Sequence, residues 1–449
     1  MGVGSFCDNP RSHSSFIISH SKQMSSLNRL TAAEAARQIA AGKITSEALV
    51  RDCLDRIAER DGEVHAWVHC DADAALAQAR AVDKSPGKGP LRGVPVAFKD
   101  VIDTFDMPTQ YNSAIYRGYR PRIDAACVAL VRHAGGVVLG KTVTTEFATR
   151  TAGPTRNPHN LEHTPGGSSS GSAAGVADFM VPLAFGTQTG GSNIRPAAYC
   201  GIVGYKPSFG TINRSGLKSL AESLDTIGVM ARTVEDCALL ATAVSSRALP
   251  DLMTKLARAP RVGLCRTSRW QSASAATHAA LESAATLLAQ GGAQVRDFEL
   301  PADFDRLYAE QELIMNFEGA RALAHERRTA PELMSTYLRQ TTQEHWDMPR
   351  SRYDDAMRHA RECRHVFDGL FTDVDVLLTP SAPDVAPRGL ESTGSSLFNR
   401  NWTLLGAPCV TVPFGRGEHG LPLGIQIVGR YDDDARVLQA AEWVRQMVG

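Results

Sequence analysis

The segment 165–206 most constrains what this chain can fold into, because it places two turn-forming stretches on either side of an apolar run. The first stretch reads P-G-G-S-S-S-G-S-A-A-G from Pro165, and the second reads G-T-Q-T-G-G-S-N-I-R from Gly186. Between them, residues 176–185 are apolar except for one Asp and one Pro. We therefore expect two backbone-rich, serine-bearing loops at opposite ends of one buried helix or strand.

The remainder of the chain has the pattern of an α/β layered domain, in which helices and strands alternate. Helical periodicity is expected at 46–60, 124–134, 234–244, 273–290 and 434–448, and strands are expected at 93–98, 136–139, 262–265, 294–299, 374–378, 409–413 and 423–428. One sheet explains this alternation better than several separate modules. The nearly all-helical segment 303–370 is expected to contribute to the substrate cleft.

Composition limits the partners and the compartment. The 48 basic residues balance the 48 acidic residues, so net charge offers no argument for a nucleic acid or an anionic membrane. No pair among the nine cysteines is spaced C-x-x-C, which favours reduced thiols in the cytoplasm. Residues 1–23 lack the apolar region of a signal peptide and are expected to be a disordered tail before one domain at 24–449. We predict a cytoplasmic protein with a small-molecule substrate, no nucleic acid and no membrane, and leave a homodimer open.

Several chemical interpretations of the glycine-serine stretches can be compared. A flexible linker is the simplest, but the flanking apolar runs argue against it. A phosphate loop would need G-K-[ST], which is missing. The match to G-x-S-x-G at 167–171 is weak, because it also requires a downstream Asp and His that cannot be placed. The histidines form no metal-binding pattern, so we expect no metal and no cofactor.

Lys99 is the candidate base, because it follows directly on the predicted strand 93–98. An ordinary lysine, with a pKa of ~10.4, is protonated at neutral pH, whereas burial lowers the pKa. A neutral lysine can draw a proton from one serine, which in turn draws on a second, nucleophilic serine. The alternative is that Lys99 is a surface lysine and that the glycines only shape turns.

Several motifs in one order resemble those of the amidase signature family of serine hydrolases, from about Thr31 to the C-terminus. They are G-V-P-V-A-F-K-D at 93–100, N-P at 157–158, P-G-G-S-S-S-G-S at 165–172, G-T-Q-T-G-G-S at 186–192, P-A-A-Y-C-G at 196–201, K-P-S at 206–208, L-D-T at 224–226 and G-I-Q-I-V-G at 424–429.

The resemblance implies a single large α/β domain, with a central mixed sheet covered by helices on both sides. It also implies that Lys99 is the base, that Ser168 is a relay serine entered through a cis peptide bond, and that Ser192 is the nucleophile. The turn Thr189, Gly190 and Gly191 would then supply N–H groups to the oxyanion, which is usually the largest single catalytic contribution.

Two residues depart from the family pattern G-T-D-T-G-G-S-I-R. Gln188 stands in place of the Asp, and Arg195 comes one position later than the usual arginine. This variant is similar to the malonamidase branch, in which an arginine at this place holds a substrate carboxylate. We therefore predict that Arg195 and Gln188 contribute to substrate binding, with a structural role for Arg195 as the alternative.

The predicted function is hydrolysis of a small carboxamide, such as a malonamate-like one that carries a carboxylate, to a carboxylic acid and ammonia. Within the family, the alternative is the amidase subunit of a tRNA-dependent amidotransferase. A catalytically silent binding or scaffold protein is a third interpretation, against which the complete set Lys99, Ser168 and Ser192 argues.

Overall fold

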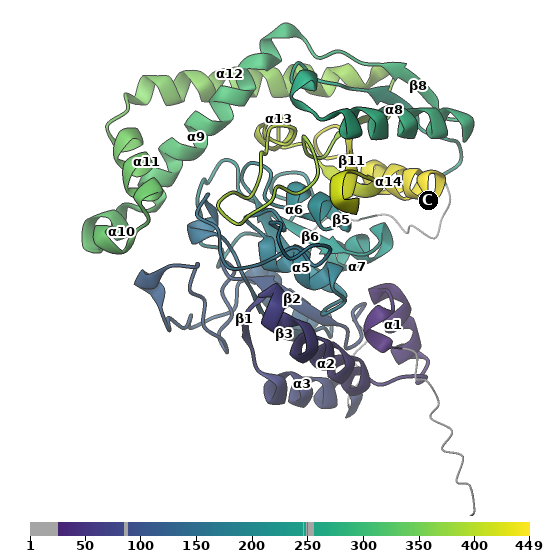
Figure 1. Ribbon diagram of the computed structural model, residues 1–449, viewed down its shortest axis with the longest axis vertical. Helices are drawn as coiled ribbons and strands as arrows, with labels where there is room; N and C mark the ends of the chain where they lie inside the picture. The colour runs from purple at the N-terminus through teal and green to yellow at the C-terminus, as the bar shows by residue number, and fades with distance from the viewer. Residues whose placement is uncertain (1–25, 85–88, 246, 248, 250–255) are drawn as a thin grey trace, which may run out of the picture.

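A mixed sheet of 11 strands forms the centre of the molecule (Figure 1). The computed structural model describes residues 26–84, 89–245, 247, 249 and 256–449, so the predicted tail at 1–23 lies outside the described residues. The strand order is β1-β3-β2-β4-β6-β5-β10-β11-β9-β7-β8. Strand β2 runs parallel to β3 and β4, and β7 runs parallel to β8 and β9, whereas the other neighbours are antiparallel. The strands are β1 (Trp67–Cys70), β2 (Pro95–Lys99), β3 (Val137–Thr142), β4 (Leu183–Gln188), β5 (Val203–Lys206), β6 (Thr226–Ala231), β7 (Arg261–Leu264), β8 (Gln294–Asp297), β9 (Val376–Pro380), β10 (Cys409–Arg416) and β11 (Pro422–Val428).

Helices cover both sides of the sheet, which confirms the predicted fold class. They are α1 (Ala32–Ala40), α2 (Ser46–Val64), α3 (Ala72–Lys84), α4 (Ala126–His133), α5 (Ser170–Ala177), α6 (Ile194–Tyr199), α7 (Val234–Val244), α8 (Ala275–Gln290), α9 (Leu307–Ala322), α10 (Ala324–Thr329), α11 (Thr336–Trp346), α12 (Arg350–Gly369), α13 (Arg400–Leu404) and α14 (Asp434–Val448). Figure 1 shows α9 to α12 as an arm that reaches out beyond the sheet. No helix among the described residues is long and apolar enough to cross a membrane.

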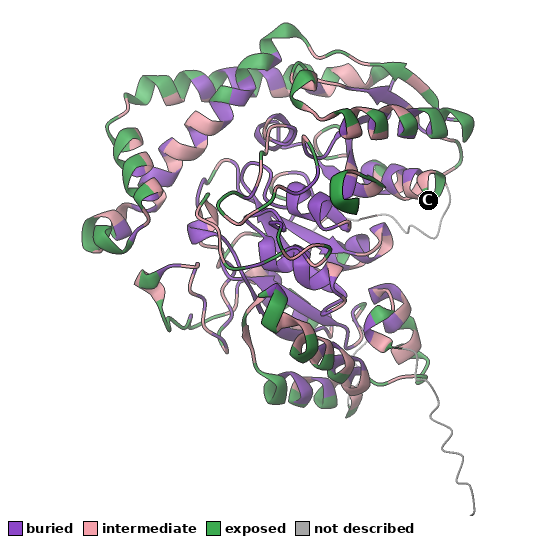
Figure 2. Ribbon diagram, viewed as in Figure 1, coloured by how far each residue is buried: buried purple, intermediate pink, exposed green. Residues whose placement is uncertain are grey.

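The inner strands of the sheet and the short helices α5 and α6 are mostly buried, whereas the arm alternates buried and exposed positions (Figure 2). Every residue of β2 and β4 is buried, and Phe98 stacks on Phe185 between these two strands with ring centroids 5.0 Å apart. A strand that is buried on both faces reads as a continuous apolar run, which explains why the motif before Lys99 contains no alternation. A polar residue at the end of such a strand is therefore buried as well.

The central segment folds differently from the prediction of one buried helix or strand with a loop at each of its ends. Helix α5 ends at Ala177, the chain turns through 178–182, and β4 then returns antiparallel to the helix direction. Pro182 cannot continue a helix, and Asp178 accepts hydrogen bonds from Arg56 and Arg60 at the turn. Because the chain doubles back, the two glycine-serine loops lie side by side: the N–H of Ser169 donates to the carbonyl of Ser192 at 3.3 Å.

Candidate active site

Lys99 is the last residue of β2 and its side chain is fully buried. Its Nζ lies 2.7 Å from Oγ of Ser168 and 2.7 Å from Oγ1 of Thr187. Burial holds the pKa of Lys99 well below its ordinary range; the buried Asp225 opposes this shift, and the charge of Arg195 adds to it. A lowered pKa favours the neutral amine, which is the form that can accept a proton from a serine hydroxyl.

Ser168 lies in the first glycine-serine loop, next to the residue, Ser169, that contacts the second loop at Ser192. The peptide bond between Gly167 and Ser168 is cis, the isomer that the resemblance implies. The side chain of Ser168 is buried, and its carbonyl accepts a hydrogen bond from the N–H of Thr145 at 3.3 Å. In the next residue, Oγ of Ser169 lies 3.1 Å from the N–H of Thr187 and 3.2 Å from its carbonyl. These bonds hold the serine loop against the end of β4.

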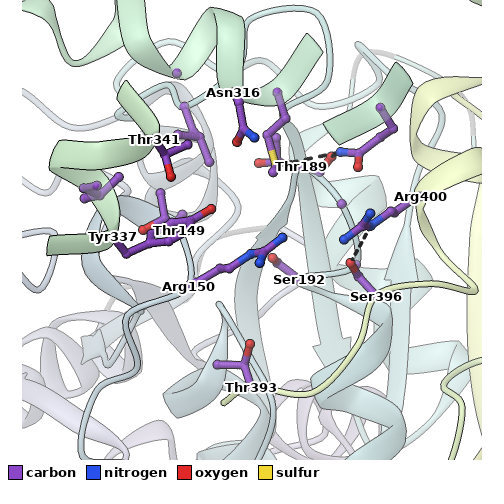
Figure 3. A pocket seen from close by; sticks show the side chains of 18 of the residues that line it. Thr149, Arg150, Thr189, Ser192, Asn316, Tyr337, Thr341, Thr393, Ser396 and Arg400 are labelled. Carbon is purple, nitrogen blue, oxygen red and sulfur yellow. Dashed lines mark hydrogen bonds between the residues drawn. The ribbon is translucent and has the colours of Figure 1, made fainter. Parts of the chain in front are cut away.

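Ser192 opens onto a cavity of about 580 Å³ (Figure 3). The cavity lies between the ends of the central strands and the arm, so the helical segment 303–370 does contribute to it. Its polar lining includes Thr149, Arg150, Thr189, Ser192, Arg195, Gln311, Asn316, Tyr337, Thr341, Glu391, Thr393, Ser395, Ser396 and Arg400. Lys99 and Ser168 are not part of the lining, so Ser192 is the serine of this set that a ligand can reach.

The carbonyl groups before Ser192 are all held by hydrogen bonds. The carbonyl of Thr189 accepts from Nε2 of Gln311 at 2.8 Å, that of Gly190 accepts from Oγ1 of Thr403 at 2.7 Å, and that of Gly191 accepts from the N–H of Arg195 at 3.0 Å. In a planar trans peptide the N–H points opposite to the carbonyl of the same unit. The N–H groups of Gly190, Gly191 and Ser192 therefore point away from these donors. The use of Thr189, Gly190 and Gly191 for an oxyanion remains a prediction.

Gln188 is buried within the protein and does not line the cavity. Its Oε1 accepts from the N–H groups of Asn193 and Ile194, both at 3.0 Å, and its Nε2 donates to Oγ1 of Thr403 at 2.9 Å. The geometry thus gives no contact that supports the predicted role of Gln188 in substrate binding. Instead, the hydrogen bonds of Gln188 stabilise the junction between the turn that carries Ser192 and the start of α6.

Asn193, which displaces the arginine by one position, fills a space that glycines leave open. Its Nδ2 donates to the carbonyl of Tyr205 at 3.1 Å. A Cβ at Gly228 would lie 2.6 Å from Cγ of Asn193, and a Cβ at Gly186 would lie 2.6 Å from its Oδ1. Neither position tolerates a larger side chain, because real Cβ atoms do not approach other atoms so closely.

Arg195 reaches the cavity but most of its donors are bound within the protein. Nη1 donates to the carbonyl of Gly394 at 2.8 Å, and Nη2 donates to the carbonyl of Gly167 and, at 3.1 Å, to Oγ1 of Thr393. Nε is buried and has no partner among the described residues. Burial lowers the pKa of Arg195 to about 10, and the charges of Arg400 and Arg150 contribute to this lowering. This arrangement fits the structural alternative for Arg195 better than carboxylate binding.

Four residues around the site escaped the sequence analysis. Thr187 contacts the amine of Lys99, and Gln311 and Thr403 hold the peptide groups before Ser192. Asp225 accepts hydrogen bonds from Oγ1 of Thr189 at 2.6 Å and from Ser219, Leu220 and Ala221. Thr187 and Asp225 carried a signal, since they lie in the motifs G-T-Q-T-G-G-S and L-D-T; Gln311 and Thr403 belong to segments without a motif.

Comparisons with known proteins agree with this geometry. The family model described as Amidase matches residues 48–438. The chain is 36% identical to the A subunit of glutamyl-tRNA(Gln) amidotransferase of Acidothermus cellulolyticus, over 92% of this chain and 93% of that protein. It is 35% identical to the corresponding protein of Thermobifida fusca, over 93% and 95%.

Solved structures are similar along the whole fold. A crystal structure described as an amidase superposes with a TM-score of 0.86 and 27% identity, over 94% of this chain and 100% of that one. The native peptide amidase from Stenotrophomonas maltophilia superposes with a TM-score of 0.80 and 28% identity, over 94% and 97%. The fold and the site thus define a hydrolase of amide C–N bonds. The chain belongs to the amidase signature family.

The relatives contradict one prediction. We predicted that nucleic acid is not among the partners, yet relatives that align along more than nine-tenths of both chains are named for a reaction on glutamyl-tRNA(Gln). The error came from the balanced net charge, which describes the chain as a whole. Net charge does not report on a local surface or on another protein that works beside the chain.

Proposed function

We propose that the chain hydrolyses a carboxamide to a carboxylate and ammonia through an acyl-enzyme on Ser192. Lys99 takes the proton of Ser168 as Ser168 takes the proton of Ser192, whose Oγ attacks the carbonyl carbon. The N–H groups of Gly190 and Gly191 stabilise the oxyanion, and the relayed proton leaves with the ammonia. Water then attacks the acyl group along the same relay and releases the acid. The observation that carries the proposal is the buried Lys99, 2.7 Å from Ser168.

Relatives favour a role as the amide-cleaving component of a tRNA-dependent amidotransferase. The support is the identity of 35–36% along nearly the full length of two proteins that are named as one component of such an enzyme. In that role the chain would work together with partner proteins and would act in a reaction on a tRNA-bound amino acid.

A second candidate is a hydrolase of small amides that works alone. The departures at Gln188 and Arg195 favour it, because they separate this chain from the pattern G-T-D-T-G-G-S-I-R. A peptide amidase of similar fold is 28% identical. The likeness to the malonamidase branch and the carboxylate role of Arg195 remain predictions. A silent scaffold is disfavoured, because a scaffold has no need for a buried lysine in contact with Ser168.

The isolated chain and its Ser192→Ala variant distinguish these alternatives. Ammonia release would be measured on glutamine, asparagine, succinamate, glutaramate, valeramide and a peptide amide, together with labelling by a fluorophosphonate. Turnover by the isolated chain that Ser192→Ala abolishes supports the second candidate. Labelling of Ser192 with turnover only after partner proteins from the same cells are added supports the amidotransferase role. Neither labelling nor turnover under both conditions would refute amide hydrolysis.

A further inference from the structure

Two arginines on separate segments reach into the cavity and share one carboxylate. Arg150 follows the short turn Glu146–Ala148, and Arg400 begins α13. Nη2 of Arg150 donates to Oε1 of Glu312, and Nη1 of Arg400 donates to Oε2 of the same residue at 3.0 Å. Glu312 lies on α9, next to Gln311. Figure 3 shows Arg150 and Arg400 directed into the space that also contains Ser192.

Each guanidinium keeps donors that no described protein atom uses. Arg150 donates only to Glu312 in the described part of the chain, and Arg400 donates to Glu312 and, through Nε at 3.2 Å, to Oγ of Ser396. Nε and Nη1 of Arg150 and Nη2 of Arg400 thus stay available. The side chain of Arg150 is 55% exposed and that of Arg400 is 20% exposed, and both line the cavity. Arg195 differs from them, because protein acceptors occupy its terminal nitrogens.

Short contacts connect this pair to the catalytic turn. Ser396, which accepts from Arg400, packs directly on the glycines before Ser192: a Cβ at Gly190 would lie 3.6 Å from Oγ of Ser396, and one at Gly191 would lie 2.8 Å from its Cβ. One small side chain therefore separates the Arg400 guanidinium from the turn that carries the nucleophile. On the other side, Arg150 lies over the ring of Tyr337, with Cζ 5.4 Å from the ring centroid.

The charges of this part of the cavity do not cancel. Arg150 and Arg400 share the carboxylate of Glu312, and the lining also contains Arg195 and Glu391, so these five side chains carry one net positive charge. If the cluster only linked the arm to the start of α13, the Arg400–Glu312 pair alone would suffice, and exposed ion pairs add little stability. With a second guanidinium at the same carboxylate, two planar groups of N–H donors lie close together, and this arrangement suits the binding of one anion by both.

We propose that Arg150 and Arg400, held by Glu312, bind a carboxylate of the substrate, so that the natural substrates are amides with an acid group at the end remote from the scissile bond. The proposal rests on the amide hydrolysis proposed above and names its substrate class. It also assigns the acid group to residues other than Arg195. The sequence departures around Ser192 then act within the protein, and the acid-binding residues come from the segment after the turn Glu146–Ala148 and from the start of α13.

Matched pairs of substrates test the proposal. The wild type, Arg150→Gln, Arg400→Gln and the double variant would be assayed on glutaramate and on valeramide, which has a similar chain and no charge. We expect the wild type to prefer glutaramate in kcat/KM, and each single exchange to lower this preference by about tenfold, mainly through KM, with about a hundredfold in the double variant. Arg358→Gln is the control, since Arg358 is an exposed residue of α12 that pairs with Asp355 outside the cavity.

A binding measurement keeps the proposal separate from turnover. Calorimetry on Ser192→Ala with glutarate, the product of glutaramate hydrolysis, should detect binding that weakens as salt is raised and that the double exchange Arg150→Gln/Arg400→Gln abolishes. Equal preference for charged and neutral amides, or glutarate binding that survives the double exchange, overturns the proposal while amide hydrolysis stands. Absence of Ser192 labelling and of turnover on every amide, with and without partner proteins, refutes the proposed function, and absence of glutarate binding refutes the carboxylate site.

Discussion

Replacing Lys99 by Met tests the base directly, because methionine keeps a similar length and removes the amine. Lys99 is fully buried and contacts Ser168 and Thr187 at 2.7 Å, so the exchange leaves two neutral hydroxyls and no unpaired charge. A general base contributes about 10²- to 10⁴-fold to rate, or about 3–5 kcal/mol of the barrier. We expect kcat/KM on any accepted amide to fall by that factor.

The stability of this variant should move in the opposite direction to its activity. The pKa of Lys99 is below its ordinary range, so between the lowered pKa and the ordinary one the unfolded chain binds a proton that the folded chain does not. This difference opposes folding by about 1.4 kcal/mol per pKa unit, and the opposition fades as pH rises towards the unfolded pKa. Lys99→Met removes this destabilising contribution. The free energy of unfolding of the variant at neutral pH should equal or exceed that of the wild type, and the difference should shrink as pH rises.

Lys206 offers a matched control. It is also fully buried, burial also lowers its pKa, and its Nζ donates only to the carbonyl of Pro207 among the described residues. Lys206→Met should therefore show a similar pH trend in urea unfolding with the kinetics of the wild type. Ammonia release and circular dichroism would be recorded for both variants. If folded Lys99→Met retained more than about a tenth of the wild-type kcat/KM, the assignment of Lys99 as the base would be refuted.

Four further outcomes are expected. In the wild type, kcat/KM should rise with pH through the lowered pKa of Lys99, and a rate profile without this limb would contradict a neutral base. Gln311→Leu should lower kcat by about tenfold with little change in KM, because Gln311 orients an oxyanion peptide; steady-state kinetics would show this split. Lys141→Met should lower the free energy of unfolding by about 3–5 kcal/mol, since it leaves the buried carboxylate of Asp100 without its lysine partner. Adding Asp100→Asn should restore part of the lost stability. Arg195→Met should slow neutral and acidic amides alike; a loss confined to acidic amides would instead support the role in substrate binding.

Local patterns predicted much of the fold. Helices at 234–244 and 434–448 have the predicted bounds, because apolar residues recur there at helical spacing. The strand ending at Lys99 was readable from its unbroken apolar run. The strands β1, β5 and β6 were not predicted, and the turn at 178–182 was missed. Whether an apolar run continues or doubles back depends on partners such as Arg56, which lies far away in the sequence.

The site was predictable only where a motif marked it. Lys99, Ser168 and Ser192 belong to motifs, and the structure brings Lys99 and both serine loops together. Gln311 and Thr403 contact the catalytic turn across sequence separations of 122 and 213 residues, and no spacing rule reaches that far. The position and the type of a residue do not reveal which acceptors its side chain will meet. For this reason a buried role for Gln188 was not apparent from its place beside the nucleophile.

The central claim is that Ser192 becomes acylated with Lys99 as the base. Mass spectrometry after rapid quenching of the enzyme with an accepted amide, and after exposure to a fluorophosphonate, measures this directly. We predict one adduct, on the peptide that contains Ser192, which is lost in Ser192→Ala and forms much more slowly in Lys99→Met. An adduct on another residue, or amide hydrolysis undiminished in Ser192→Ala, would contradict the account.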